Sequence, residues 1–187
     1  DELYQLCKKY NMPLYVDGAR LGYGLTATGT DIDLPFLAHH CDVFYIGGTK
    51  IGALCGEAVV FTHHNAYEHF FSIQKQHGAV LAKGRLLGLQ FDALFTDNLY
   101  FEIARNANVR AEEMIEVFRK AGYDFYIDSP TNQQFVIIEN KEVKRLEKLV
   151  AFTHWGPADA NHTICRFVTS WATKREEIEA LEKVVCR

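Results

Sequence analysis

The chain has 187 residues, enough for one domain or two small ones, and 48% hydrophobic with 24% charged residues is typical of a globular protein. Its net charge of −4 and scattered lysines and arginines exclude the broad basic surface that nucleic acids require. We find no apolar stretch of 18 residues and therefore expect no membrane partner.

The cysteines indicate a reducing compartment. Their number is odd and no C-x-x-C spacing occurs, which fits free thiols rather than a disulfide framework. We therefore expect a cytoplasmic protein. The chain starts at Asp1, without an initiator Met and already within a helical pattern, so we expect it to be a piece of a longer protein.

The first third alternates helical and strand patterns. A helical pattern over residues 1–10 ends at Asn11-Met12-Pro13, and the segment that follows the Asp17–Arg20 turn, rich in Gly and Thr, is expected to be a loop through Gly29. A short helix is predicted at 33–38, with Asp33 as its N-cap. Strands are predicted at 14–16, 43–46 and 57–62. This alternation is typical of an α/β layer.

The rest of the chain is first helical and then mixed. From about His64 to Gly122 the pattern is helical nearly throughout, and Gly122 ends the last helix as a C′ residue would. Strands at 134–138, 151–155 and 164–169 follow, with helices at 143–149 and 175–185. Such a succession predicts an α+β unit built on a small sheet.

Two short motifs stand where predicted strands end. Asp17-Gly18-Ala19-Arg20 follows the strand at 14–16, and Gly47-Gly48-Thr49-Lys50 follows the strand at 43–46. Because ligands of α/β sheets bind beyond the carboxyl ends of the strands, we expect a carboxylate, a guanidinium and an amine at one rim. These groups suit amino-acid chemistry on pyridoxal phosphate.

Each of these residues also has an ordinary interpretation. Lys50 could be an exposed lysine, but the glycines around it allow a ligand to approach closely, and partial desolvation at a strand end would free its amine for Schiff-base formation. Asp17 could cap the turn or hold a pyridine nitrogen protonated. Arg20 could lie on the surface or bind a carboxylate or phosphate through its fork.

Two further arginines and the histidines complete the candidates. Arg166 lies within an otherwise apolar strand, where an edge or solvent-facing position is as well supported as a cleft that holds an anionic substrate. For Arg85, beside Gly84 and Gly88, a position on the surface of a helix is the default interpretation. Neither His39-His40-Cys41 nor His63-His64 has zinc-ligand spacing, so no metal site is predicted.

The segment Leu14–Arg20, with a lysine turn 33 residues after Asp17, resembles the threonine aldolase/β-eliminating lyase family of type I (aspartate-aminotransferase-like) pyridoxal-phosphate enzymes. The Asp-Gly-Ala-Arg tetrapeptide carries most of this resemblance. It implies that Asp17 pairs with the pyridine nitrogen and that Lys50 is the internal aldimine lysine.

The resemblance also implies roles for three arginines. Arg20 and Arg166 would bind the substrate carboxylate. The stretch Lys83-Gly84-Arg85 is similar to a Gly-Met-Arg stretch of threonine aldolases, which would place Arg85 near the cofactor phosphate or a dimer contact. The lysine turn departs from the family's Ser-Lys-Gly-Leu pattern and has Thr49-Lys50-Ile51-Gly52 instead.

The resemblance spans nearly the whole chain but only the C-terminal half of the family's sequence. It implies an α/β fold with residues 1–96 as part of the cofactor-binding large domain and residues 97–187 as a small α+β domain. The implied cofactor is pyridoxal 5'-phosphate and the implied assembly a homodimer or homotetramer.

The resemblance implies a lyase that acts on small amino acids, with aldol cleavage of a β-hydroxy amino acid as the leading reaction. The alternatives are β-elimination of the tryptophanase or tyrosine phenol-lyase kind, transamination, or a non-catalytic fragment. A fragment of that kind would lack the half that binds the cofactor phosphate.

Overall fold

The computed structural model describes residues 1–186, which form two compact units. The first contains Asp1–Leu25 and Asp31–Tyr100, and the second contains Thr26–Thr30 and the chain from Phe101 onward. The segment Thr26–Thr30 is hydrogen-bonded to the rest of the second unit, since Thr28 Oγ1 donates to Glu112 Oε1 at 2.6 Å. The assignment of residues 1–96 and 97–187 to two domains of the family stays a prediction.

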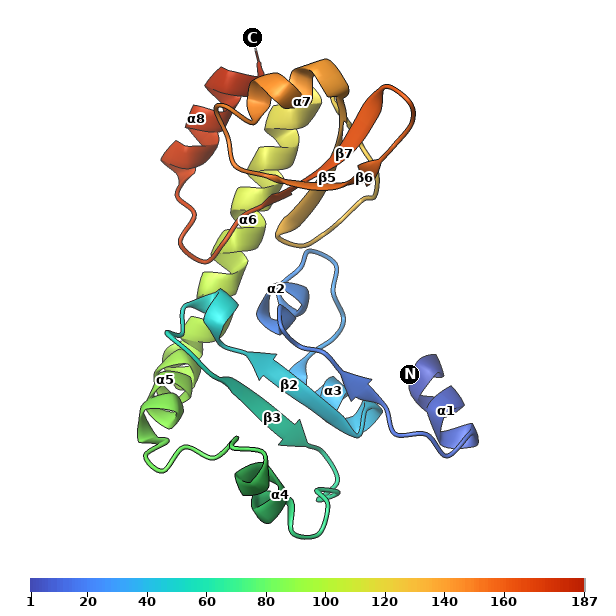
Figure 1. The fold of residues 1–187 in the computed structure, drawn as a ribbon, viewed down its shortest axis with the longest axis vertical. Coiled ribbons are helices and arrows are strands. Elements are labelled where there is room, and N and C mark those ends of the chain that lie inside the picture. Colours follow the sequence, from blue (N-terminus) through green and yellow to red (C-terminus); the bar gives the residue numbers. More distant parts are fainter. Residues whose placement is uncertain (187) are drawn as a thin grey trace. The chain divides into compact units, whose positions relative to one another are not determined.

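A three-stranded sheet forms the centre of the first unit (Figure 1). Its strands are β1 (Tyr15–Val16), β2 (Val43–Gly47) and β3 (Glu57–Phe61), in the order β1-β2-β3. β1 and β2 are parallel, and β2 and β3 are antiparallel. The three predicted strands are thus confirmed, and the parallel pair brings the chain after β1 and the chain after β2 to the same edge.

Along the chain, helices precede, separate and follow these three strands. They are α1 (Glu2–Lys9), α2 (Leu21–Leu25), α3 (Leu34–His40), the 3-10 turn η1 (Thr49–Ile51), α4 (Phe70–Gln76), α5 (Arg85–Phe95) and the 3-10 turn η2 (Thr96–Asn98). The predicted cap of α3 is confirmed, because the side chain of Asp33 accepts a hydrogen bond from the Phe36 N–H at 2.7 Å.

Two expectations about local structure were wrong. The segment after Arg20 is not all loop, because Tyr23 is only 2% exposed and burying its ring holds α2 in helical form despite two glycines. The stretch from His64 to Gly122 is not helical throughout either. His64 and His69 have φ of 52° and 59°, so the backbone is not helical just ahead of α4. A second non-helical segment separates α4 from α5.

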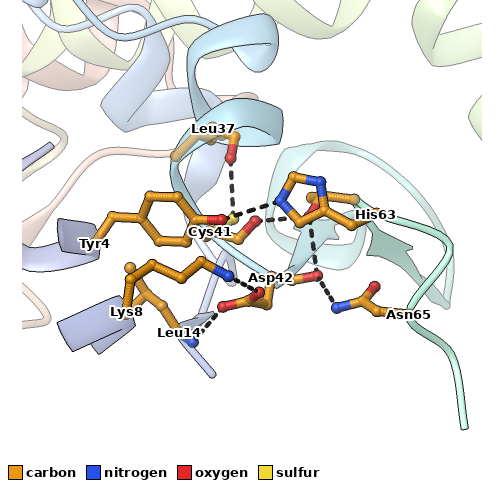
Figure 2. Close-up of polar contacts among 9 residues, drawn as sticks. Tyr4, Lys8, Leu14, Leu37, Cys41, Asp42, His63 and Asn65 are labelled. Carbon is orange, nitrogen blue, oxygen red and sulfur yellow. Dashed lines mark hydrogen bonds and ion pairs between the residues drawn. The ribbon is translucent and has the colours of Figure 1, made fainter. Parts of the chain in front are cut away.

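A buried carboxylate holds α1 against the start of the sheet (Figure 2). Asp42, 7% exposed, accepts hydrogen bonds from the Leu14 N–H at 2.8 Å and from Lys8 Nζ at 2.9 Å. Beside this pair the Tyr4 hydroxyl lies 3.1 Å from His63 Nε2. Burial alone raises the pKa of Asp42, but these two hydrogen bonds and the charge of Lys8 outweigh it and hold the pKa below its usual value.

The second unit contains an antiparallel sheet with the order β4-β5-β7-β6. Its strands are β4 (Asp124–Phe125), β5 (Gln133–Glu139), β6 (Thr153–Pro157) and β7 (His162–Val168). Its helices are α6 (Leu99–Lys120), of which the part from Phe101 onward belongs to this unit, α7 (Asn140–Leu146) and α8 (Arg175–Val185). Only β4, two residues long, was not predicted. After α6, Gly122 has a φ of 82° and ends the helix as expected.

The core of the second unit lies on one face of this sheet. Its buried members come from α6, α7, α8 and alternate positions of β5 and β7: Met114, Val117, Phe118, Val136, Ile138, Val143, Leu146, Cys165, Phe167, Ile178, Leu181 and Val185. Because side chains alternate across a strand, Arg166 points to the opposite face. None of the helices formed by residues 1–186 combines the length and apolar character needed to cross a membrane.

We predict that Asp42→Asn makes the chain less sensitive to acid. A carboxyl whose pKa is lowered by folding stabilises the fold above its unfolded pKa of about 3.9, and this contribution is lost as the pH falls further. Urea denaturation between pH 6 and pH 3 should show Asp42→Asn about 1–3 kcal/mol less stable at pH 6, with a smaller further loss on acidification. The exposed Asp31→Asn is the matched control, and parallel curves for all three proteins would contradict this account.

Candidate active site

Two glycine turns touch backbone to backbone at the edge where β1 and β2 end. The Gly47 N–H donates to the Gly18 carbonyl at 3.0 Å. A Cβ atom on Gly18 would lie 1.6 Å from the Tyr45 carbonyl oxygen, and one on Gly47 would lie 2.5 Å from the Ala19 carbonyl oxygen. Only glycine fits at these positions, and the contact holds the two predicted motifs side by side.

The turn that carries Lys50 is held from two directions. The carboxylate of Glu57 accepts hydrogen bonds from the Gly48 N–H at 2.7 Å and from the Thr49 hydroxyl at 3.0 Å. From α2, the Tyr23 hydroxyl donates to the Lys50 carbonyl. The backbone of this one-turn helix is therefore fixed at the residue that bears the candidate amine.

The side chain of Lys50 is exposed, so the expected partial desolvation is wrong for this chain. In η1 the neighbouring Ile51 points inward and is only 2% exposed, which turns Lys50 outward. The amine is therefore accessible to a ligand at the sheet edge.

Asp17 is held as an anion at the same edge. Its Oδ1 accepts hydrogen bonds from the Tyr45 hydroxyl at 2.5 Å and from the Ala19 N–H at 3.0 Å. These two hydrogen bonds, with smaller contributions from the charges of Lys50 and Arg20, hold the pKa of Asp17 below its usual value. The turn-capping role and an anionic site role are thus compatible, because the cap uses only one carboxylate oxygen.

A buried tyrosine joins α2 to the turn that carries Lys50. Tyr100 is fully buried, and its hydroxyl accepts from the Gly22 N–H at 3.1 Å and donates to the Gly47 carbonyl at 3.3 Å. Burial raises the pKa of this phenol, so it stays protonated and keeps its donor. Tyr100 also stacks on Phe95, with ring centroids 5.0 Å apart.

Sequence reasoning missed four residues of this site: Tyr23, Tyr45, Glu57 and Tyr100. One signal was present, because Tyr45 comes five residues before Lys50, within the strand that pairs with the strand before Asp17. The other three reach the turns from separate elements, and no local pattern announces such contacts.

Arg20 and Arg85 belong to the first unit but have no fixed partners. Arg20 is half-buried directly after the Asp17 turn, and Arg85 is exposed as the first residue of α5. In the described chain neither guanidinium forms a hydrogen bond or ion pair. α5 contacts the segment after the lysine turn, since Gln90 Oε1 accepts from the Leu54 N–H at 2.6 Å.

Arg166 lies in the second unit on β7, an interior strand, so the expected alternative of an edge position is wrong. Its guanidinium is half-buried, donates to Gln133 Oε1 at 3.3 Å and to Thr153 Oγ1 at 3.2 Å, and lies 5.4 Å from the centre of the Trp155 ring. No carboxylate of residues 1–186 pairs with it, so its charge is available for an anion. That it shares a site with Asp17 and Lys50 stays a prediction.

Residues 1–186 contain no group of three His, Cys, Asp or Glu side chains that could hold a metal ion. The paired histidines have other partners. His63 lies against Tyr4, and Nδ1 of His40 lies 2.8 Å from the Phe36 carbonyl.

Comparison with known proteins gives a consistent result, although no family model matches the chain. The chain is 27% identical over 183 residues to a low-specificity L-threonine aldolase of Pseudomonas aeruginosa, which covers 95% of this chain and 51% of the relative. It is also 27% identical over 179 residues to the low-specificity L-threonine aldolase of a Pseudomonas species, where it covers 50% of the relative. The chain thus spans about half the length of the curated relatives it matches.

Solved structures agree. A Leishmania major threonine aldolase superposes with a TM-score of 0.93 and 34% identity, over 98% of this chain and 54% of that one. A Sphingomonas wittichii serine palmitoyltransferase superposes with a TM-score of 0.69 over 99% of this chain and 49% of that one, and at 14% identity it is similar in fold alone.

These neighbours and the paired strand ends define the class, which is the α/β fold of the type I pyridoxal-phosphate transferases. Within that class, the chain is similar to the threonine aldolases over nearly its whole length.

We predict that Gly18→Ala and Gly47→Ala each destabilise the first unit by about 1–3 kcal/mol or more, because the new methyl group would overlap a backbone carbonyl. Gly24→Ala is the matched control: apart from its chain neighbours and its own helix backbone, no atom lies within 4 Å of its Cβ position, and Ala in a helix is about 0.5–1 kcal/mol better than Gly. Chemical denaturation of the three variants should separate the first two from the third. Equal midpoints would show that the turns do not depend on this contact.

Proposed function

We propose that this chain supplies the C-terminal half of a pyridoxal-phosphate-dependent lyase that cleaves β-hydroxy amino acids. The observation that carries the proposal is the placement of an anionic Asp17 and an exposed Lys50 at the ends of two adjacent parallel strands. The threonine aldolases of Pseudomonas and Leishmania major support the same reaction class.

The side chains at this edge fit pyridoxal phosphate. Asp17 Oδ2 has no hydrogen-bond partner among residues 1–186, so an anionic oxygen is free to accept from the N–H of a protonated pyridine ring. Lys50 offers an exposed amine on a fixed backbone. A serine palmitoyltransferase of similar fold has been solved with its pyridoxal-phosphate internal aldimine. When bound, pyridoxal phosphate supplies an electron sink for charge that develops at the amino acid's Cα.

Each side chain then has a definite task. Asp17 holds the proton on the ring nitrogen through its negative charge. Lys50 Nζ holds the cofactor and afterwards carries a proton as general base or acid at Cα. Arg20 and Arg166 would bind the substrate carboxylate and thereby orient the amino acid. Arg85 binds the cofactor phosphate or contributes to a subunit contact.

Aldol cleavage leads because the named relatives are threonine aldolases. β-Elimination and transamination are the second and third candidates, and a non-catalytic fragment is the fourth. We further propose a homodimer or homotetramer and a cytoplasmic location, the latter supported by five free cysteines.

Lys50→Ala tests the cofactor assignment. In a protein that joins this chain to the family's preceding segment, added pyridoxal phosphate should give a visible absorbance band, and borohydride should then fix the cofactor to the peptide that contains Lys50. Lys50→Ala should lose the band, the adduct and turnover of threonine, whereas the exposed Lys75→Ala should keep all three. Normal turnover in Lys50→Ala would refute the lyase assignment.

Arg166→Lys tests the substrate contact. Lysine keeps the positive charge but cannot form the bidentate pair of hydrogen bonds that a guanidinium forms with a carboxylate. The kcat/KM for threonine should therefore fall roughly 10- to 100-fold with unchanged cofactor binding. Arg175→Lys, at an exposed arginine at the start of α8, is the control. If both variants retain the wild-type kcat/KM, Arg166 does not bind the substrate.

A further inference from the structure

Tyr45 stands beside Asp17 because of the register of two strands. β1 pairs with β2 in parallel through Tyr15↔Val43 and Val16↔Phe44, so the next step along both chains places Asp17 next to Tyr45. Alternation along the strands puts Tyr15, Asp17 and Tyr45 on one face and the buried Phe44 on the other.

The Tyr45 ring is constrained within this face. It is half-buried, and its centroid lies 6.3 Å from the centroid of the Tyr15 ring. Its hydroxyl donates to Asp17 Oδ1 at 2.5 Å, a short hydrogen bond of the kind formed with a charged acceptor. The carboxylate in turn raises the pKa of the Tyr45 phenol to about 12, so the hydroxyl keeps its proton across the physiological range.

Both hydrogen bonds to Asp17 end on the same oxygen. The Ala19 N–H also reaches Oδ1, at 3.0 Å, whereas Oδ2 has no partner among residues 1–186. Two donors from different segments, one backbone and one side chain, fix the rotation of the carboxylate group. The fixed rotation presents one free anionic oxygen in a constant direction.

We propose that Tyr45 is a positioning residue, whose hydroxyl holds Asp17 by Oδ1 so that Oδ2 faces the ring nitrogen of pyridoxal phosphate. This inference rests on the proposed function, because it assigns the free oxygen to the cofactor. It adds a residue that acts through Asp17 and touches neither cofactor nor substrate. Outer partners of this kind commonly set the orientation and charge of the group that makes the direct contact.

The test compares Tyr45→Phe with Tyr15→Phe. Each variant removes one phenolic hydroxyl from the same sheet face, and only the Tyr45 hydroxyl bonds Asp17. The first readout is the pKa of Asp17 in the 187-residue chain, from the pH dependence of its carboxyl carbon signal in NMR spectra. Tyr45→Phe should raise this pKa toward its ordinary value, and Tyr15→Phe should leave it unchanged.

The second readout is pyridoxal-phosphate affinity and the pH dependence of the cofactor band in the longer protein. Tyr45→Phe should weaken binding roughly three- to tenfold and lower kcat with little change in KM, since the substrate contacts remain. Denaturation midpoints of both variants show whether either has lost its fold.

Three results would overturn the inference in different ways. An unchanged pKa of Asp17 in Tyr45→Phe would show that the hydroxyl does not hold the carboxylate. A raised pKa with wild-type affinity would show that this hold does not serve the cofactor. If the wild-type longer protein failed to bind pyridoxal phosphate at Lys50, the proposed function and the cofactor part of this inference would both fail, while the Asp17 titration would still decide the Tyr45 contact.

Discussion

The site depends on one close approach of backbone to backbone. The two turns after β1 and β2 come together through the hydrogen bond between the Gly47 N–H and the Gly18 carbonyl, with no space for a side chain on either residue. Strand pairing alone would bring the ends of β1 and β2 to one edge, but it would leave the turns free to diverge. The glycine contact removes that freedom and fixes where Asp17 and Lys50 emerge.

Around this contact, residues from other elements hold the turn that carries Lys50. Glu57 at the start of β3 holds the lysine turn, Tyr23 of α2 holds the Lys50 carbonyl, and Tyr100 bridges Gly22 and Gly47. The side chains of Asp17 and Lys50 themselves remain exposed. A rigid backbone with accessible side chains is what a site for a bound cofactor requires, because little conformational entropy is lost when the ligand arrives.

The contacts of Asp17 and of Arg166 leave both side chains charged. Asp17 receives two hydrogen bonds on one oxygen and lies within the influence of two cations, which keeps it anionic. Arg166 in the second unit has only neutral partners, Gln133 and Thr153, and the face of Trp155. Neutral partners orient the guanidinium without neutralising it, and its charge stays available for an anion.

Local sequence determined much of this protein. Short apolar runs followed by glycine turns indicated β1 and β2, Asp33 indicated the start of α3, and the tetrapeptide Asp17–Arg20 indicated the resemblance to threonine aldolases, because each of these signals lies within a few neighbouring residues. The exposure of Lys50 and the interior position of Arg166 could not be deduced in the same way, since burial depends on what packs against a strand or turn.

Only the tertiary structure decided which distant groups support the site. The hydrogen bond from Tyr45 to Asp17 joins two residues that are 28 positions apart in sequence, and it follows from the register of β1 and β2. The hydrogen bond between Tyr100 and Gly22 joins residues that are 78 positions apart. The sequence by itself placed the acid and the amine at two strand ends. Their mutual geometry came from long-range pairing and packing, which a local pattern does not encode.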